Sequence, residues 1–174
     1  MGRGNKVSAP AGHILFVCTG NTCRSPMAEA LTNLYLQEAG MEHSWFATSA
    51  GIAVWHRLPA AAGAVEALKE YGLDISVHRS RSIDEISLQD VALILGMTKE
   101  HVDFLHDRYP EKKGAIFRFS DYLVSGIEGP GNGFSLFFGD IPDPFGLDPA
   151  AYRDVARTLA MYAKELVKRL EACS

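Results

Sequence analysis

Short apolar runs alternate along this chain with longer amphipathic segments, and this alternation constrains the fold more than any other feature. The runs 13–18 and 90–97 are short, continuous and bounded by turn residues, which is typical of strands buried on both faces. The segments 45–49 and 115–118 are further strand candidates, and helices are predicted over 26–40, 60–71 and 98–108 and from 149 onward. Strands that alternate with helices predict an α/β domain, here a small doubly wound four-stranded parallel sheet with helices on both faces.

The helix ends carry recognisable signals. Ser25 and Asp148 each precede a proline, and an N-cap residue followed by proline at the first helical position predicts a helix start. Gly40 and Gly72 follow the last periodic residues of two helices, where glycine favours termination. The loop between the first strand and the Ser25 helix therefore lies beyond the carboxyl end of a central strand, where ligands bind in such sheets.

The composition excludes several classes of protein. Of 174 residues, 47% are hydrophobic and 22% are charged, as in a soluble globular domain rather than a disordered chain. The 17 Lys and Arg against 21 Asp and Glu leave a net charge of −4, so no general attraction to nucleic acid or to an anionic membrane is expected. Residues 1–12 are predicted to be a disordered N-terminal extension, and residues 13–174 a single domain.

Three cysteines, Cys18, Cys23 and Cys173, are too few for a disulfide-stabilised secreted scaffold. No metal site is expected, because Cys18 and Cys23 lack a second pair of ligands at a suitable spacing. The first residues show no apolar segment of signal-peptide type, and the longest apolar runs are too short to cross a bilayer. A cytoplasmic location is therefore expected. Cys173 is expected to be an incidental surface thiol.

The segment between the first strand and the first helix carries the chemistry. A lone cysteine that ends a strand is usually a small buried hydrophobic residue. Here, however, Cys18 and Arg24 flank a loop whose backbone N–H groups, with the helix dipole behind them, can bind phosphate. The same positive field favours a nucleophilic Cys18 thiolate. Gly20 permits a tight turn of the loop. Ser25 can both cap the helix and stabilise the Cys18 sulfur. The predicted phosphate-binding residues are Thr19, Gly20, Asn21, Thr22, Cys23, Arg24 and Ser25.

The segment 13–31 (HILFVCTGNTCRSPMAEAL) resembles the active-site segment of the low-molecular-weight protein tyrosine phosphatases. The likeness continues through Thr48-Ser49-Ala50-Gly51, His78 and Asp143-Pro144. It implies a flavodoxin-like fold and a protein phosphatase that needs neither a metal nor an organic cofactor. Cys18 is then the nucleophile that forms a cysteinyl-phosphate, Arg24 binds the phosphoryl group, and Asp143 is the general acid.

The resemblance also implies supporting roles. Asn21, Ser49 and His78 are expected to form a hydrogen-bond scaffold behind the loop. Trp55 and Phe145 are candidates for the walls of the substrate slot, although both residue types also serve in ordinary packing. Cys23 is expected to form a reversible disulfide with an oxidised Cys18.

The family favours phosphotyrosine on proteins as the substrate. Two residues point to the alternative, phosphoarginine: Thr22 stands where many members carry a branched apolar residue, and Gly146 follows Phe145 where eukaryotic members have a second tyrosine. Both features look like the bacterial protein-arginine phosphatase branch. A hydroxyl near the slot tolerates N–H donors better than a methyl group does.

Two other classes of function remain as alternatives. Arsenate reductases share a similar cysteine loop, but they need two further cysteines in mid-chain, and none stands between Cys23 and Cys173. A phosphate-binding module without catalysis would have no need of Cys18, Arg24 and Asp143 together. The sequence does not choose among four roles for the glycine-rich stretch Gly126–Gly139: a lid, a contact with a substrate protein, a dimer surface or a packed loop. The chain is expected to be a monomer or a weak dimer.

Overall fold

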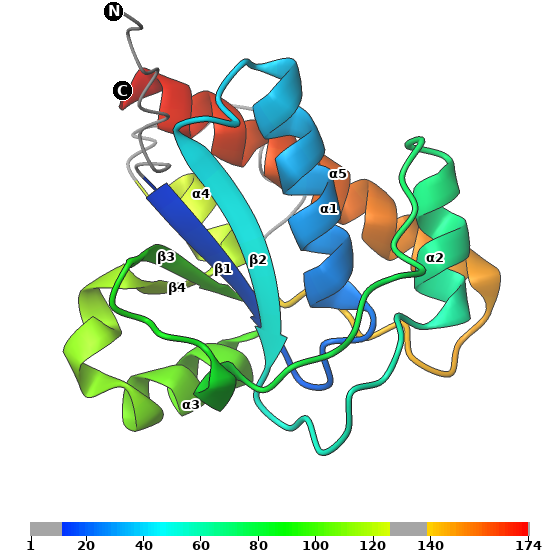
Figure 1. The fold of residues 1–174 in the computed structure, drawn as a ribbon, viewed down its shortest axis with the longest axis horizontal. Helices are drawn as coiled ribbons and strands as arrows, with labels where there is room; N and C mark the ends of the chain where they lie inside the picture. Colours follow the sequence, from blue (N-terminus) through cyan, green and yellow to red (C-terminus); the bar gives the residue numbers. More distant parts are fainter. Residues whose placement is uncertain (1–11, 126–138, 174) are drawn as a thin grey trace, which may run out of the picture.

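The computed structural model describes residues 12–125 and 139–173, and it confirms the predicted α/β architecture (Figure 1). Four parallel strands form one sheet in the order β2-β1-β3-β4. The strands are β1 (Gly12–Cys18), β2 (Trp45–Gly51), β3 (Val91–Gly96) and β4 (Ile116–Arg118). The helices are α1 (Arg24–Glu38), α2 (Ala62–Lys69), α3 (Lys99–Arg108), α4 (Phe119–Val124) and α5 (Pro149–Ala172), with short 3₁₀ turns η1 (Ile83–Glu85) and η2 (Pro110–Ala115).

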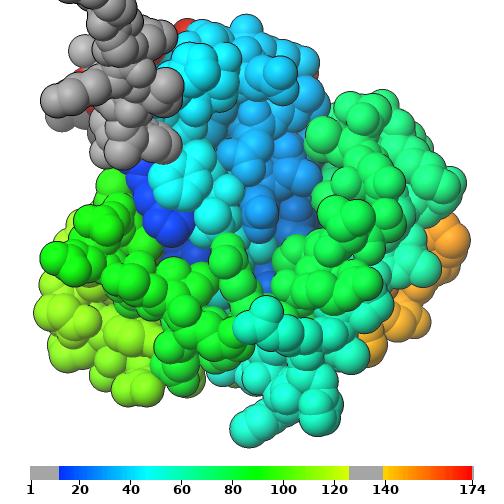
Figure 2. All heavy atoms as spheres, in the orientation of Figure 1, coloured from blue at the N-terminus to red at the C-terminus, as the bar shows by residue number. Residues whose placement is uncertain are grey.

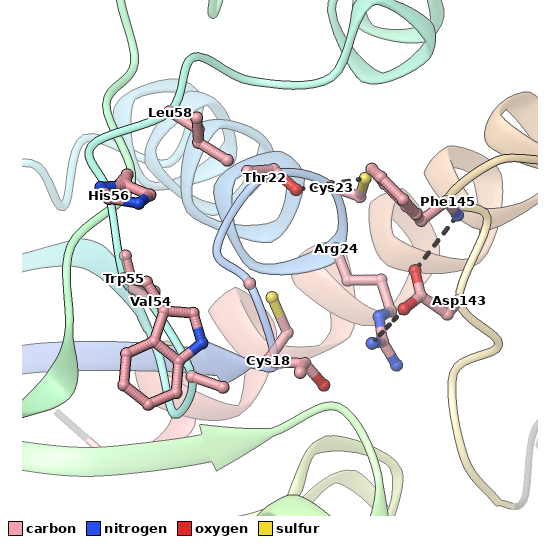
Figure 3. Close-up of a pocket in the computed structure, with 13 residues that line it drawn as sticks. Cys18, Thr22, Cys23, Arg24, Val54, Trp55, His56, Leu58, Asp143 and Phe145 are labelled. Atoms are coloured by element: carbon pink, nitrogen blue, oxygen red, sulfur yellow. Dashed lines mark hydrogen bonds and ion pairs between the residues drawn. The ribbon is translucent and has the colours of Figure 1, made fainter.

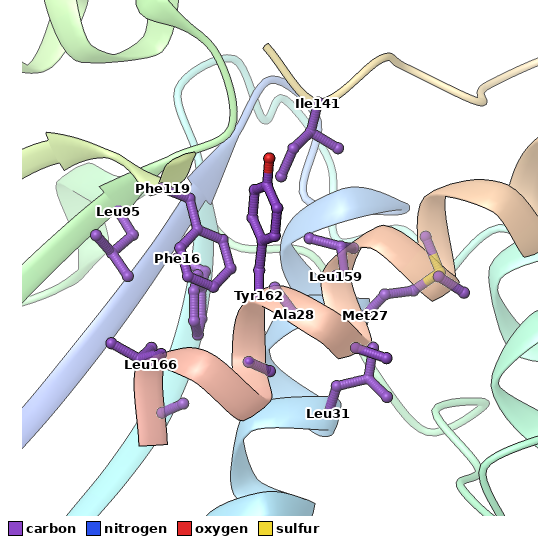
Figure 4. Packing of buried hydrophobic residues seen from close by; sticks show 14 of the residues in the cluster. Phe16, Met27, Ala28, Leu31, Leu95, Phe119, Ile141, Leu159, Tyr162 and Leu166 are labelled. Carbon is purple, nitrogen blue, oxygen red and sulfur yellow. The ribbon is translucent and has the colours of Figure 1, made fainter. Parts of the chain in front are cut away.

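Each face of the sheet has its own hydrophobic cluster, because successive side chains of a strand point to opposite faces. Phe16 of β1 packs in the larger cluster with α1 and α5, where Leu31 and Tyr162 are also buried (Figure 4). Leu15 of β1 belongs to the smaller cluster with Leu105 of α3. Figure 1 shows α1, α2 and α5 on one side of the sheet and α3 on the other. Burial on both faces explains why β1 and β3 read as continuous apolar runs.

The predicted helix ends are only partly right. Asp148 caps α5 by accepting a hydrogen bond from the backbone N–H of Ala151 (2.9 Å), as expected. Gly40 and Gly72 have φ of +68° and +70°, the left-handed conformation that glycine adopts without strain. Ser25, however, is not an N-cap: α1 begins at Arg24, and Cys23 occupies the cap position without capping the helix through its side chain.

Other boundaries also differ from the prediction. Helix α2 is shorter than the predicted 60–71, and α4 was not predicted at all. Gly12 was assigned to a disordered extension, but it is the first residue of β1 and pairs with Trp45. The remainder of that extension, residues 1–11, and nearly all of the Gly126–Gly139 stretch lie outside the described residues.

Three connections meet at the carboxyl ends of the strands. The loop after β1 accepts hydrogen bonds from the segment after β2, where the N–H groups of Ile52 and Ala53 donate to the carbonyls of Cys18 and Thr19. The N–H of Ile141, in the loop before α5, donates to the carbonyl of Met97. The segment 52–61 protrudes beyond this end of the sheet (Figures 1 and 2). No helix in the described part of the chain is long and apolar enough to span a membrane.

Candidate active site

Cys18 is the last residue of β1, and its side chain is almost completely buried. Its Sγ lies 2.9 Å from Oγ of Ser25. Nδ2 of Asn21 donates to the same Ser25 oxygen at 2.9 Å. With this hydrogen bond accepted, the Ser25 proton can be donated either to the Cys18 sulfur or to the carbonyl of Ala50, which lies 3.4 Å from Oγ. A hydroxyl that donates to sulfur stabilises a thiolate, both as a nucleophile and as a leaving group.

Asn21 adopts the conformation that turns the loop. It has φ of 54°, and among the described residues it alone combines a positive φ with a side chain. The left-handed residue of this loop is therefore Asn21, a residue type that tolerates this region, and not Gly20. Its Oδ1 accepts from the N–H of Arg81 (3.0 Å), and its carbonyl lies 2.8 Å from Nε2 of His78.

A buried network continues behind the loop. Nδ2 of Asn21 donates to Oγ of Ser49 at 2.9 Å, and Ser49 donates in turn to Oε2 of Glu29. Burial raises the pKa of Glu29 above its usual value. The structure thus brings together Asn21, Ser49 and His78, the three residues expected to support the loop. Glu29 was missed, because nothing in its helical spacing separates it from a solvent-exposed glutamate.

Arg24 joins the loop to the segment that carries Asp143. Its Nη2 forms an ion pair with Oδ2 of Asp143 at 2.9 Å, and its Nη1 donates to the carbonyl of Ile141 at 3.2 Å. The Arg24 side chain is 5% exposed, whereas that of Asp143 is 49% exposed. Nε of Arg24 is buried and has no hydrogen-bond partner among the residues that the structure describes. A buried guanidinium with an unused donor is suited to bind an anion.

Cys18, Arg24 and Asp143 line one pocket of about 290 Å³ (Figure 3). Trp55 lies to one side of Cys18, while Phe145 and Asp143 lie to the other. Trp55 and Phe145, the two predicted wall residues, both line this pocket. Their side chains are largely exposed, Trp55 at 87% and Phe145 at 69%. Further lining residues that the sequence did not single out are Ala53, Val54, His56 and Leu58.

Cys23 also lines the pocket, and it is a free thiol, as are Cys18 and Cys173. Its Sγ lies 3.7 Å from Oγ1 of Thr22 and 3.9 Å from the hydroxyl of Tyr152. Burial raises the pKa of Cys23, so this thiol keeps its proton. Cys173 is exposed at the end of α5 and lies outside the pocket.

The close approach of β2 to the loop depends on glycine. A Cβ atom on Gly51 would lie 2.6 Å from the Thr19 carbonyl oxygen and 2.6 Å from Cγ2 of Val54. Gly51 therefore lets the end of β2 pack directly on the backbone of the loop that follows β1. Across residues 12–125 and 139–173, no group of three or more His, Cys, Asp or Glu side chains is placed to hold a metal ion.

Comparisons with known proteins agree on one family. A family model described as low molecular weight phosphotyrosine protein phosphatase matches residues 13–173. A protein-arginine-phosphatase from Geobacillus stearothermophilus is 36% identical over 158 residues, covering 91% of this chain and 95% of that protein. A crystal structure of a low molecular weight protein tyrosine phosphatase from T. tengcongensis is 38% identical, has a TM-score of 0.78, and covers 91% of this chain and 99% of that one.

One further structure bears on the chemistry. YwlE arginine phosphatase, in a mutant whose active-site cysteine is replaced by a phosphorylated serine, is similar with a TM-score of 0.78. It is 31% identical and covers 91% of this chain and 95% of that one. Because the family model spans nearly all of the described chain, the protein belongs to the low molecular weight phosphotyrosine protein phosphatase family.

Proposed function

We propose that this protein hydrolyses phosphorylated side chains of proteins through a cysteinyl-phosphate on Cys18. The observation that carries the proposal is the pocket that brings together Cys18, the carboxylate of Asp143 and Arg24, whose Nε has no partner among the described residues. The relative with a phosphorylated active-site serine supports a phosphoryl group covalently held at the corresponding position.

The reaction takes two steps. In the first, the Cys18 thiolate attacks phosphorus, the bond from phosphorus to the leaving oxygen or nitrogen breaks, and Asp143 gives its proton to the leaving atom. In the second, Asp143 accepts a proton from water as the water attacks phosphorus. The S–P bond then breaks, inorganic phosphate leaves, and Ser25 stabilises the thiolate that returns. The N–H groups of residues 19–25 and the guanidinium of Arg24 stabilise the phosphoryl oxygens throughout.

Phosphoarginine is the substrate that the pocket and the relatives together favour. Thr22, with its polar hydroxyl, lines the pocket. The protein-arginine-phosphatase of G. stearothermophilus matches this chain over nearly its whole length. A guanidinium group offers N–H donors that a hydroxyl can accept and a methyl group cannot. We therefore place phosphoarginine first in this proposal, whereas the sequence alone favoured phosphotyrosine.

Phosphotyrosine is the second candidate, and a different observation favours it. Trp55 and Phe145 stand at the mouth with large exposed aromatic surfaces, which suit the flat ring of a phenol. The T. tengcongensis relative is a tyrosine phosphatase of closely similar fold.

Replacing Thr22 with isoleucine is expected to shift preference from phosphoarginine toward phosphotyrosine by about tenfold, because the hydroxyl that meets the N–H donors is lost. The measurement is the ratio of kcat/KM for matched phosphoarginine and phosphotyrosine peptides. Thr22→Ser, which keeps the hydroxyl, is the control and should retain the wild-type ratio. An unchanged ratio in Thr22→Ile would show that this side chain does not select the substrate.

Replacing Cys23 with serine is expected to reduce the recovery of activity after peroxide treatment. Peroxide converts the Cys18 thiolate to a sulfenic acid; the Cys23 thiol then attacks its sulfur, water leaves, and a disulfide forms that an added thiol reduces. Without Cys23 the sulfenic acid is open to irreversible oxidation. Recovered turnover after dithiothreitol measures the effect, with Cys173→Ser as the matched control. Equal recovery in Cys23→Ser would rule out the protective role.

The remaining expectations are proposals of the same kind. The protein is proposed to act in the cytoplasm as a monomer or a weak dimer, with a phosphorylated protein as its partner and phosphate or another oxyanion in the Cys18 loop. Residues 13–174 are proposed to form its single catalytic domain.

A further inference from the structure

His101 lies in the first turn of α3 and is only 2% exposed, yet the proposed mechanism assigns it no role. Its two ring nitrogens have different partners. Nε2 lies 2.9 Å from Oγ1 of Thr19, the residue that follows Cys18. Nδ1 lies 3.2 Å from the backbone nitrogen of Thr98 and 3.0 Å from its hydroxyl. His101 therefore connects the start of α3 directly to the phosphate loop.

The partners of His101 determine its tautomer. The backbone N–H of Thr98 can only donate, so Nδ1 must accept and carries no proton. The proton of the neutral ring is then on Nε2, and Nε2 donates to the hydroxyl oxygen of Thr19. Thr98 in turn accepts from the backbone N–H of His101, which completes a capping box with histidine in the position usually held by Glu or Gln.

Burial keeps His101 neutral. It lowers the pKa of His101 to about 4, and the positive charge of Arg24 acts in the same direction. The carboxylates of Asp143 and Asp140 act in the opposite direction but do not outweigh burial. The Nε2–H tautomer is consequently the form present near neutral pH.

The N–H of His101 Nε2 determines in which direction the Thr19 hydroxyl can donate its proton. Thr19 is exposed and lines the pocket that holds Cys18 and Arg24. Because Oγ1 of Thr19 already accepts from His101, its own proton remains to be donated elsewhere. In a pocket that receives a doubly charged phosphoryl group, a hydroxyl is useful when its proton faces the anion.

We propose that the side chain of Thr19 is a further oxyanion-binding group of this site, and that His101 is the positioning residue that directs the Thr19 proton toward the phosphoryl oxygens. This role is additional to the backbone N–H groups of the loop, and it does not depend on which phosphorylated side chain is bound. It rests on the proposed function only in that the pocket binds phosphate.

The first test measures the binding of inorganic phosphate by calorimetry, which requires no turnover. Thr19→Val, which keeps the shape and removes the hydroxyl, is expected to weaken phosphate binding about tenfold relative to Thr19→Ser, which keeps it. Equal affinities in the two variants would overturn the inference. Failure of the wild-type protein to bind phosphate and to hydrolyse any aryl phosphate would instead overturn the proposed function.

The second test replaces the donor. His101→Gln keeps an acceptor for Thr98 and a donor for Thr19, whereas His101→Glu keeps the cap on α3 but can only accept from Thr19. We expect His101→Glu to bind phosphate about tenfold more weakly than His101→Gln, since the Thr19 proton then turns toward the carboxylate. Similar urea midpoints would show that the two variants fold alike. Equal phosphate affinities would overturn the positioning role.

A double mutant separates orientation from simple charge repulsion. If His101 acts through Thr19, the difference between the Glu and Gln variants should shrink in a Thr19→Val background. If the new carboxylate only repels phosphate, the full difference should persist in that background, and the positioning role would be wrong.

Discussion

Replacing Cys18 with serine is expected to lower kcat by about 10⁴-fold or more on every phosphorylated substrate. A serine hydroxyl is scarcely ionised at neutral pH, and once phosphorylated it is a much poorer leaving group than a thiolate. Ser25 and Asn21 would still support the loop, because their hydrogen bond to each other does not involve the sulfur. Steady-state hydrolysis of an aryl phosphate gives kcat, and mass spectrometry of the intact protein detects a retained phosphoryl group.

Cys173→Ser is the matched control for that variant. Cys173 is exposed and distant from the pocket lining, so its replacement should leave kcat and KM at wild-type values. Retention of a tenth or more of wild-type turnover by Cys18→Ser would contradict the phosphocysteine mechanism. It would point to water attacking phosphorus directly, with the loop acting only as a binding site.

Replacing Asp143 with asparagine is expected to lower kcat by about 10²- to 10⁴-fold, because proton transfer is lost in both steps. The loss in the first step should be smaller for an activated aryl phosphate, whose leaving group needs little protonation. The second step should remain slow, so phosphoenzyme should accumulate. Rapid-quench experiments with such a substrate measure a burst of released phenol followed by slow turnover.

Asp154→Asn controls for the loss of a nearby carboxylate. Asp154 lies on α5 beside a second cavity that Asp143 also lines, and it pairs with Arg157 on the surface. Its replacement should change kcat less than twofold, as exposed ion pairs contribute little. If Asp143→Asn were as active as Asp154→Asn, the general acid would have to be another group.

The sequence predicted well which residues of the loop after β1 lie together, because that part of the candidate site is local. Residues 18–25 form one strand–loop–helix junction, so the cysteine, the loop and Arg24 are brought together by neighbouring backbone alone. Even here Ser25 was misassigned as a cap. Its hydroxyl lies beside the Cys18 sulfur, as expected, but it also accepts a hydrogen bond from Asn21, which was not predicted.

The other half of the site depends on distant contacts. Asp143 is 119 residues from Arg24, and only the family resemblance selected it among the acidic residues. His101 contacts Thr19 across 82 residues, and a single histidine on a helix gives no sign of such a partner. Helix α4 was missed because six residues, Phe119–Val124, are too few to show a helical period.

The ion pair between Arg24 and Asp143 also bears on how readily the enzyme clears its product. A buried guanidinium left without a counterion would hold inorganic phosphate tightly and stall the next cycle. In this structure Nη2 of Arg24 is paired with the carboxylate of Asp143 at 2.9 Å. In the proposed mechanism this carboxylate would compete with inorganic phosphate for the guanidinium, and product inhibition would be weaker as a result.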